Sequence, residues 1–244
     1  MKIILTGATG MIGLEVLAQC IKSPSVTQII VLIRKPLPES TSTSPKIRVI
    51  IHENFLSYPD SVLQQLSGAQ ACIWAQGVVK AKTCELQREI NVTYPLTFIE
   101  AIRPYLRPEL LSQQRKFNFI YISGLACERN MDRKLWVLSQ ARKIKGEMEN
   151  HLIAQTGANT DTFAGYITRP GSVIPPNSKL MDVLGVLTSP IYPVMKVEEL
   201  AVAMIDISLN GLLERSEDVK LEDYLTIMHD ELQRRGREIL KSGL

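Results

Sequence analysis

The chain has 244 residues, of which 45% are hydrophobic and 22% are charged, so a disordered or fibrous protein is excluded. The length suits one α/β domain with a small appended lobe. Twenty-eight basic against 25 acidic residues leave a net charge of +3, which is too small and too dispersed for a nucleic-acid-binding surface. Apolar runs stay shorter than about 18 residues, so no membrane span is expected. Residues 1–10 run directly into a glycine turn, which argues against a signal peptide.

The four cysteines show neither a CxxC pair nor the spacing of a metal site, and they are typical of buried residues in a reducing compartment. They are Cys20, Cys72, Cys84 and Cys127. We therefore expect a soluble cytoplasmic protein without a metal, either a monomer or a homodimer, whose partner is a small molecule.

Short apolar runs alternate along the chain with segments of helical periodicity. Strands are predicted at residues 3–5, 29–33, 47–51, 71–75, 117–122 and 163–168. Helices are predicted at residues 12–21, 83–102 (ending near Pro104), 135–155, 197–209 and 224–240. Almost continuously apolar strands that alternate with helices indicate a Rossmann-like, doubly wound parallel sheet covered on both faces.

The character of the sequence changes after residue 171, because four prolines interrupt residues 172–195. We expect a single domain with a nucleotide-binding core at 1–171 and a small substrate or lid lobe at 172–244 that folds back over the sheet edge. The Ser/Thr/Pro-rich segment 36–45 is predicted as a surface loop, because the alternation of strands and helices continues beyond it.

The first predicted strand runs into a GxxGxxG loop that opens a helix. In such a loop Gly7 permits the tight turn, Gly10 lets the backbone approach a pyrophosphate, and Gly13 lets the helix pack closely on the sheet. The alternative is a plain strand–helix turn. The residues predicted to bind a cofactor here are Thr6, Gly7, Thr9, Gly10, Met11, Ile12 and Gly13.

A basic pair, Arg34 and Lys35, ends the second predicted strand. NAD-binding sites usually place an acidic residue at this point to hold the ribose 2′-hydroxyl, whereas an arginine accommodates a 2′-phosphate. The pair therefore favours NADP(H) over NAD(H), although it could simply end an exposed strand.

Two further segments follow predicted strands on the same side of the sheet. Asn54 and Phe55 either contact the adenine or, in the case of Phe55, belong to the core, and the sequence does not separate these alternatives. The small residues around Ala75, Gln76 and Gly77 would let a cofactor lie across the strand ends.

These features together resemble the short-chain dehydrogenase/reductase superfamily, and more narrowly its atypical NmrA-like or extended-type members, over about residues 1–210. The glycine loop TGATGMIG is the most specific motif. The other matching segments are 88–96 around Asn91, 121–124, 143–149, 168–171 and the helix after 197–199.

The resemblance implies a catalytic Ser, Tyr and Lys acting with NAD(P)H, and it places Pro170 at the cofactor. Lys145 matches the Lys, but Ala141 stands four residues earlier, where the Tyr belongs. Ser123 matches the first residue of the usual Ser pair and Gly124 the second, and Asn91 is retained. The candidate catalytic residues are accordingly Lys145, Ser123 and Asn91.

Several groups could supply the missing proton, including Lys145 itself or an ordered water near Asn91. The other candidates are Ser123, Tyr121, Cys127, Tyr166 and Tyr192. The residues expected to line the substrate pocket are Gly124, Trp136, Ala141 and Tyr192.

Three functions remain open. The first is an NADP(H)-dependent oxidoreductase acting on a small hydrophobic carbonyl or enone metabolite. The second is a non-redox isomerase, dehydratase or cyclase on the same scaffold, and the third is an NADP(H)-sensing regulator.

Overall fold

A seven-stranded parallel sheet organises the computed structural model, which describes residues 1–38, 43–176, 193–213 and 215–243. The strand order is β3-β2-β1-β4-β5-β6-β9, and every pairing is parallel. The strands are β1 (Lys2–Thr6), β2 (Gln28–Ile33), β3 (Ile47–Ile51), β4 (Ala71–Trp74), β5 (Phe117–Ile122), β6 (Phe163–Arg169) and β9 (Thr226–Met228). The order confirms the predicted Rossmann-like fold, and it reverses at β1/β4, where such sheets bind ligands.

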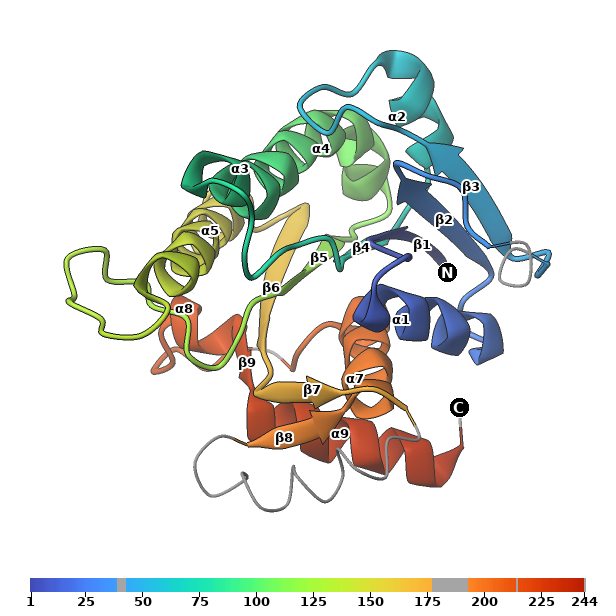
Figure 1. The fold of residues 1–244 in the computed structure, drawn as a ribbon. Coiled ribbons are helices and arrows are strands. Elements are labelled where there is room, and N and C mark those ends of the chain that lie inside the picture. The colour runs from blue at the N-terminus through green and yellow to red at the C-terminus, as the bar shows by residue number, and fades with distance from the viewer. Residues whose placement is uncertain (39–42, 177–192, 214, 244) are drawn as a thin grey trace.

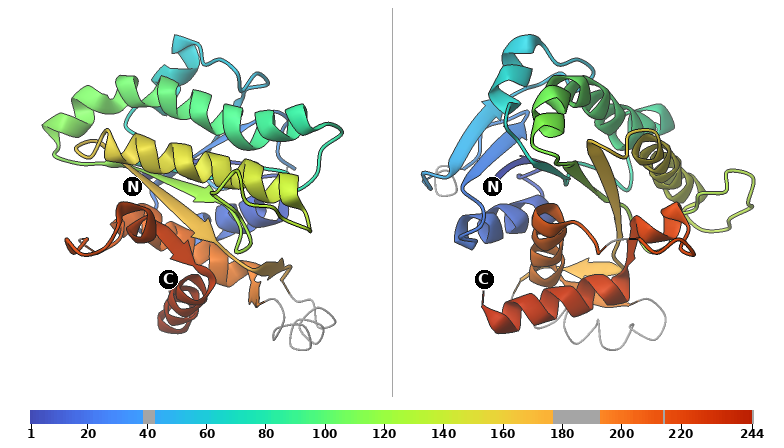
Figure 2. Two further views of the ribbon diagram at one scale, coloured as in Figure 1. Left: turned by 90° about the vertical axis from the view of Figure 1, so that its left-hand side faces the viewer. Right: turned by 180° about the vertical axis from the view of Figure 1, so that it is seen from behind.

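Helices cover both faces of the sheet (Figures 1 and 2). One layer contains α2 (Asp60–Leu66), α3 (Cys84–Arg88), the π-helical turn Glu89–Thr93, α4 (Tyr94–Ser112) and α5 (Ser139–Gly157). The other contains α1 (Met11–Lys22), α7 (Val197–Asn210) and α9 (His229–Ser242), and a short helix, α8 (Leu221–Tyr224), precedes β9. No helix in the described residues has the length and apolar character needed to cross a bilayer.

Alternate residues of each central strand enter the two cores, which explains the unbroken apolar runs in the sequence. On β1, Ile3 and Leu5 pack in the core beneath α1 and α7, whereas Ile4 packs on the opposite side with Trp74 and Phe98. Both faces of the strand are therefore buried.

The C-terminal part differs from the predicted lobe at 172–244. Strand β9 joins the main sheet beside β6, and α7 is buried against α1 and the central strands. Among the described residues of this part, the small parallel sheet of β7 (Ser172–Ile174) and β8 (Val194–Lys196) is separate from the main sheet. Helix α7 and strand β9 thus complete the core.

Three predicted helix boundaries were wrong. Helix α4 continues through Pro104 and Pro108, because both prolines lie on its exposed face, where water can satisfy the freed carbonyl groups. Helix α5 begins at Ser139 instead of 135, since Leu138 has a left-handed backbone with φ 50°. The helix predicted from residue 224 begins at His229, because residues 226–228 pair with β6.

Candidate functional site

Two of the three loop glycines are required by the packing of the chain itself. Gly7 has φ +68°, and a Cβ atom there would lie 2.5 Å from the carbonyl carbon of Ala75. A Cβ atom on Gly13 would lie 2.2 Å from the Gly7 carbonyl oxygen. Any side chain at either position would therefore collide with backbone atoms, so these glycines hold β1, α1 and the end of β4 together.

The third glycine, Gly10, is not required in this way. Its backbone is extended, and a Cβ atom would only touch the Gly7 carbonyl oxygen, at 3.4 Å. No side chain caps the N-terminus of α1, which therefore presents its first N–H groups and its positive dipole end to the space in front. A bare helix N-terminus beside an uncrowded glycine fits a phosphate group.

A cavity of about 900 Å³ lies in front of this turn, and we call it the glycine-loop cavity. Its wall includes Gly7, Thr9 and Gly10 on one side and Arg34 and Lys35 on the other. The remaining predicted loop residues lie elsewhere: Thr6 is buried at the end of β1, Met11 is exposed on α1, and Ile12 lines a second cavity.

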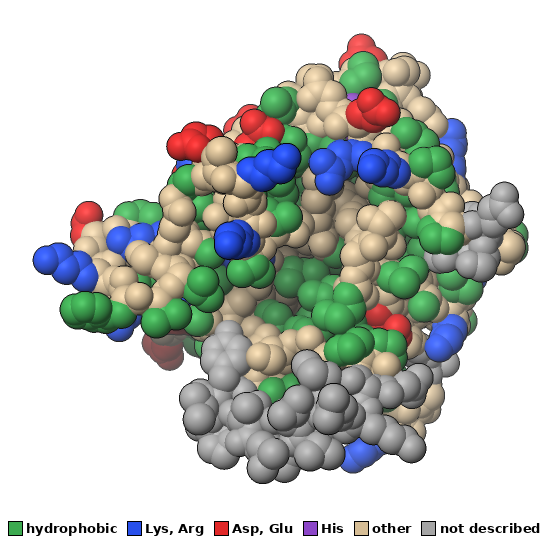
Figure 3. Space-filling view, in the orientation of Figure 1, with side chains coloured by type: hydrophobic (Ala, Val, Ile, Leu, Met, Phe, Trp, Pro, Cys, Tyr) green, Lys and Arg blue, Asp and Glu red, His purple; other side chains and the backbone are tan. Residues whose placement is uncertain are grey.

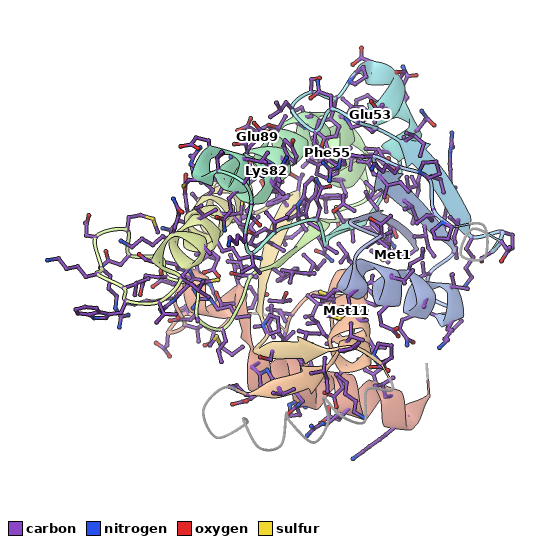
Figure 4. The ribbon with its side chains drawn as sticks, in the orientation of Figure 1. Met1, Met11, Glu53, Phe55, Lys82 and Glu89 are labelled. Carbon is purple, nitrogen blue, oxygen red and sulfur yellow. The ribbon has the colours of Figure 1, made fainter. Side chains whose placement is uncertain are left out.

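Phe55 lies in the core, which is the second of the two alternatives open for it. Its ring centroid is 5.9 Å from that of Trp74 and 5.7 Å from that of Tyr94. Asn54 uses its amide locally, since it accepts from the Leu56 backbone and donates to Ser57. Glu53, which the sequence analysis missed, lines the glycine-loop cavity instead. Figure 4 shows Phe55 among the helices above the sheet, away from Met11 at the start of α1.

The segment after β4 joins the glycine-loop cavity to a second one. Ala75, Gln76 and Gly77 line both cavities. The buried Nε2 atom of Gln76 has no hydrogen-bond partner among the described residues. An unpaired buried amide is costly, so this donor is available to a ligand.

The second cavity, which we call the apolar cavity, has a volume of about 500 Å³. That size falls within the range of small-molecule sites. Hydrophobic side chains form most of its wall, and Figure 3 shows an apolar hollow with Lys and Arg side chains along its upper rim. The predicted residues that line it are Ile12, Ala75, Gln76, Gly77, Ser123, Gly124, Cys127, Ala141, Lys145 and Pro170.

Lys145 places its amine in the wall of the apolar cavity. The Nζ atom donates a hydrogen bond of 2.8 Å to the Ile122 carbonyl oxygen and lies 5.6 Å from the centre of the Tyr121 ring. A Cβ atom on Gly77 would be 3.9 Å from Nζ, so the amine is next to the segment that both cavities share. Burial lowers the pKa of Lys145, and the nearby Cys127 and Glu149 groups act in the opposite direction.

A buried carboxylate behind the cavity was not anticipated. Glu149 is fully buried one helical turn beyond Lys145 and accepts hydrogen bonds from Ser123 Oγ, Arg129 Nε (2.6 Å) and Arg169 Nε (2.9 Å). Arg129 also donates to Thr226 on β9. Because the Ser123 proton is directed to Glu149, the hydroxyl has no proton to donate to a molecule in the cavity.

Asn91 supports the site from behind through the π-helical turn. Its side chain donates to the carbonyl oxygens of Val78 (2.9 Å) and Gln87 (2.8 Å) and accepts from the Val78 N–H (3.1 Å). The Tyr121 hydroxyl donates to the Asn91 carbonyl oxygen at 3.2 Å. Asn91 thus fixes the segment after β4, while the Tyr121 hydroxyl is used within the core.

Two predicted candidates, Trp136 and Tyr166, do not line the apolar cavity. Trp136 is fully exposed, although its neighbours Val137 and Leu138 do line the cavity. Tyr166 lies beneath the end of α7, where a Cβ atom on Gly211 would be 2.9 Å from its hydroxyl. Tyr192 lies outside the described residues. Among the described residues, the wall of the apolar cavity therefore contains no tyrosine and no histidine.

Solved structures with the same architecture are numerous and distant in sequence. The PhqB reductase domain from Penicillium fellutanum superposes with a TM-score of 0.61 at 16% identity, over 93% of this chain and 66% of that one. An L-sorbose reductase from Gluconobacter frateurii, complexed with NADPH and L-sorbose, superposes with a TM-score of 0.64 at 15% identity. This match covers 86% of this chain and 90% of that one. A short-chain dehydrogenase/reductase from Saccharomyces cerevisiae superposes with a TM-score of 0.67 at 13% identity. This match covers 94% of this chain and 96% of that one. The chain has the short-chain dehydrogenase/reductase fold.

No family model matches the chain. A curated protein, Leucinostatins biosynthesis cluster protein T from Purpureocillium lilacinum, is 34% identical over 128 residues. The match covers 52% of this chain and 44% of that protein, so it spans less than half the length of the relative.

Proposed function

We propose that the protein is an NADP(H)-dependent reductase of a small, apolar carbonyl or enone compound. One observation carries the proposal: the Lys145 amine lies where the glycine-loop cavity meets the apolar cavity. A reductase needs this juxtaposition, because the reactive end of the cofactor and the substrate must meet beside a proton source. The relative named for leucinostatin biosynthesis supports a substrate from secondary metabolism.

The residues of the glycine-loop cavity suit NADP(H). The α1 N-terminus at Gly10 would hold the pyrophosphate, and Arg34 and Lys35 would hold the 2′-phosphate. Gln76, with its unpaired amide, and Pro170 would border the nicotinamide end. The bound cofactor would supply the hydride.

Lys145 would hold the proton that the substrate oxygen receives. Ala141 offers no hydroxyl, and the Ser123 proton is directed to Glu149. The lowered pKa of the Lys145 ammonium makes it a stronger acid than an exposed lysine, and the apolar wall excludes water from its surroundings. With its proton donated to Glu149, Ser123 would not bind the substrate carbonyl oxygen, and it would instead hold the Glu149 carboxylate behind the cavity.

The test is to mix the protein with NADPH and a panel of aldehydes, ketones and enones. We expect loss of reduced-cofactor absorbance together with a product two hydrogens heavier by mass spectrometry. Turnover without cofactor consumption would instead support an isomerase, dehydratase or cyclase. Cofactor binding without any turnover would support a regulator that senses NADP(H).

A further inference from the structure

A projecting loop beside the apolar cavity exposes several large hydrophobic side chains. We call it the tip; it comprises residues 131–138, and it leaves the body of the molecule between β5 and α5 (Figure 1). Trp136 is 100% exposed, Val137 67% and Leu138 63%. A cluster of this kind on one loop marks an interaction site.

The tip is held in place by hydrogen bonds at its base. The Glu128 N–H donates to the Arg142 carbonyl oxygen at 3.1 Å, and Lys143 Nζ donates to the Met131 carbonyl oxygen at 2.6 Å. Gly146 permits this crossing, because a Cβ atom there would lie 1.8 Å from the Glu128 carbonyl oxygen. These contacts at the base hold the tip in its exposed position.

Cations surround the apolar residues. Arg133 and Lys134 are exposed on the tip and Lys143 is half-buried at its base, whereas Asp132 is the acidic residue within the tip. Arg133 pairs with Glu128 at 2.9 Å, which leaves Lys134 and Lys143 as cations without a carboxylate partner among the described residues. Figure 3 shows apolar and Lys/Arg side chains together on this projection.

We propose that the tip docks on an anionic phospholipid surface and inserts Trp136 and Leu138 among the headgroups. Tryptophan and leucine beside lysines are suited to the interface, where the apolar groups leave water and the cations meet lipid phosphates and carboxylates. Val137 and Leu138 belong both to the tip and to the wall of the apolar cavity. Docking would therefore place the cavity mouth at the lipid, from which an apolar compound enters.

The size of the tip favours a lipid surface over a second copy of the chain. Aromatic side chains bury about 150–250 Å² each, so the exposed apolar residues of the tip offer on the order of 500 Å² together. A stable protein interface needs about 800 Å² on each partner. Membrane docking needs only a few inserted side chains with supporting cations.

Tryptophan fluorescence tests the proposal without NADP(H), so it does not depend on the proposed function. The protein has two tryptophans; Trp74 is 1% exposed in the core, so a change in emission on vesicle addition reports on Trp136. We expect a blue shift and co-sedimentation with phosphatidylcholine vesicles rich in phosphatidylserine. Pure phosphatidylcholine vesicles should bind at least about fivefold more weakly, because the cations lose their partners.

Single-residue variants distinguish insertion of the tip into the lipid from nonspecific binding of the protein to vesicles. By co-sedimentation, Trp136→Ser and Leu138→Asn should each weaken vesicle binding at least about tenfold, and Lys134→Ala about fivefold. Asparagine suits the left-handed backbone at position 138. Leu213→Ser, at another exposed leucine, should bind like the wild type.

Three results would overturn the proposal. One is the absence of a blue shift and of co-sedimentation for the wild type. Another is equal binding by the wild type and Trp136→Ser. The third is concentration-dependent dimerisation in the absence of lipid that Trp136→Ser abolishes, since the tip would then be an interface between copies.

Discussion

The two cavities are built in different ways. The glycine-loop cavity is organised by a turn in which Gly7 is fixed by the backbone of Ala75 and Gly13 by the Gly7 carbonyl oxygen. The apolar cavity depends on side chains from β5, α5, the segment after β4 and the segment after β6. Behind its wall, Asn91 fixes the segment after β4 and Glu149 accepts from Arg129. The first cavity depends on a few close backbone contacts, whereas the second depends on side chains from many elements.

The largest effect is expected for Lys145→Met, which removes the proposed proton donor from the apolar cavity. Turnover should fall at least about 100-fold, with little change in the thermal midpoint. In the wild type, the rate should fall as the pH rises through the lowered pKa of Lys145, below its ordinary value of 10.5, because only the ammonium form donates. Steady-state kinetics at several pH values measure the loss of turnover and the pH dependence, and thermal melting measures the midpoint. The exposed Lys22→Met is the control, and an active Lys145→Met enzyme with an unchanged pH profile would contradict the assignment.

The next effect is on stability rather than chemistry. Glu149→Gln leaves Arg129 and Arg169 without their carboxylate, so the free energy of unfolding should fall by about 3 kcal/mol. On the same helix, Glu147→Gln removes an exposed pair with Arg88 and should cost less than about 1 kcal/mol. Urea unfolding followed by circular dichroism measures both variants. Equal losses would mean that the buried network does not support the cavity.

Gly10→Asp tests the glycine-loop cavity. NADPH affinity should fall at least about 100-fold, because a carboxylate would face the phosphates at the α1 N-terminus. The fold should survive, since there is room for a Cβ atom and aspartate is a favourable N-cap. Isothermal titration calorimetry measures the NADPH affinity, and thermal melting measures the stability.

By contrast, Gly13→Ala should lower the free energy of unfolding by at least about 2 kcal/mol, because the new Cβ atom would collide with the Gly7 carbonyl oxygen.

The smallest effect is expected at the far end of the glycine-loop cavity. Arg34→Ala should weaken NADPH binding about tenfold and leave NADH binding nearly unchanged, because the guanidinium would contact only the 2′-phosphate. Parallel titrations with the two cofactors give the ratio. Tighter binding of NADH than of NADPH by the wild type would refute the preference, whatever the variant does.

The sequence predicted what local backbone rules determine. The glycine spacing located the turn, and unbroken apolar runs located the six strands from β1 to β6. Strand β9 was missed, because its three residues gain their pairing only from β6, which ends more than 50 positions earlier. The π-helical turn around Asn91 was missed as well, since it differs from an α-helix only in hydrogen bonds that span five residues instead of four.

Side-chain relationships were harder to predict. Phe55 and Trp136 were both candidates for ligand contact, but one lies in an aromatic core and the other is exposed, and only tertiary packing decides this. Glu149 left a usable signal: it follows Lys145 by four residues among Ile144, Met148 and Leu152, on the apolar face of its helix. An acidic residue on such a face predicts a buried, paired carboxylate.

The hydrogen bond from Arg129 to Thr226 has a consequence for the order in which the molecule assembles. The glycine turn and its contact with Ala75 need only the first third of the chain, so they can form early from nearby segments. The Glu149 network also needs β9, whose residues are added near the end of the chain and join the sheet across a long sequence separation. The nucleotide end of the cleft can therefore form before its reactive end.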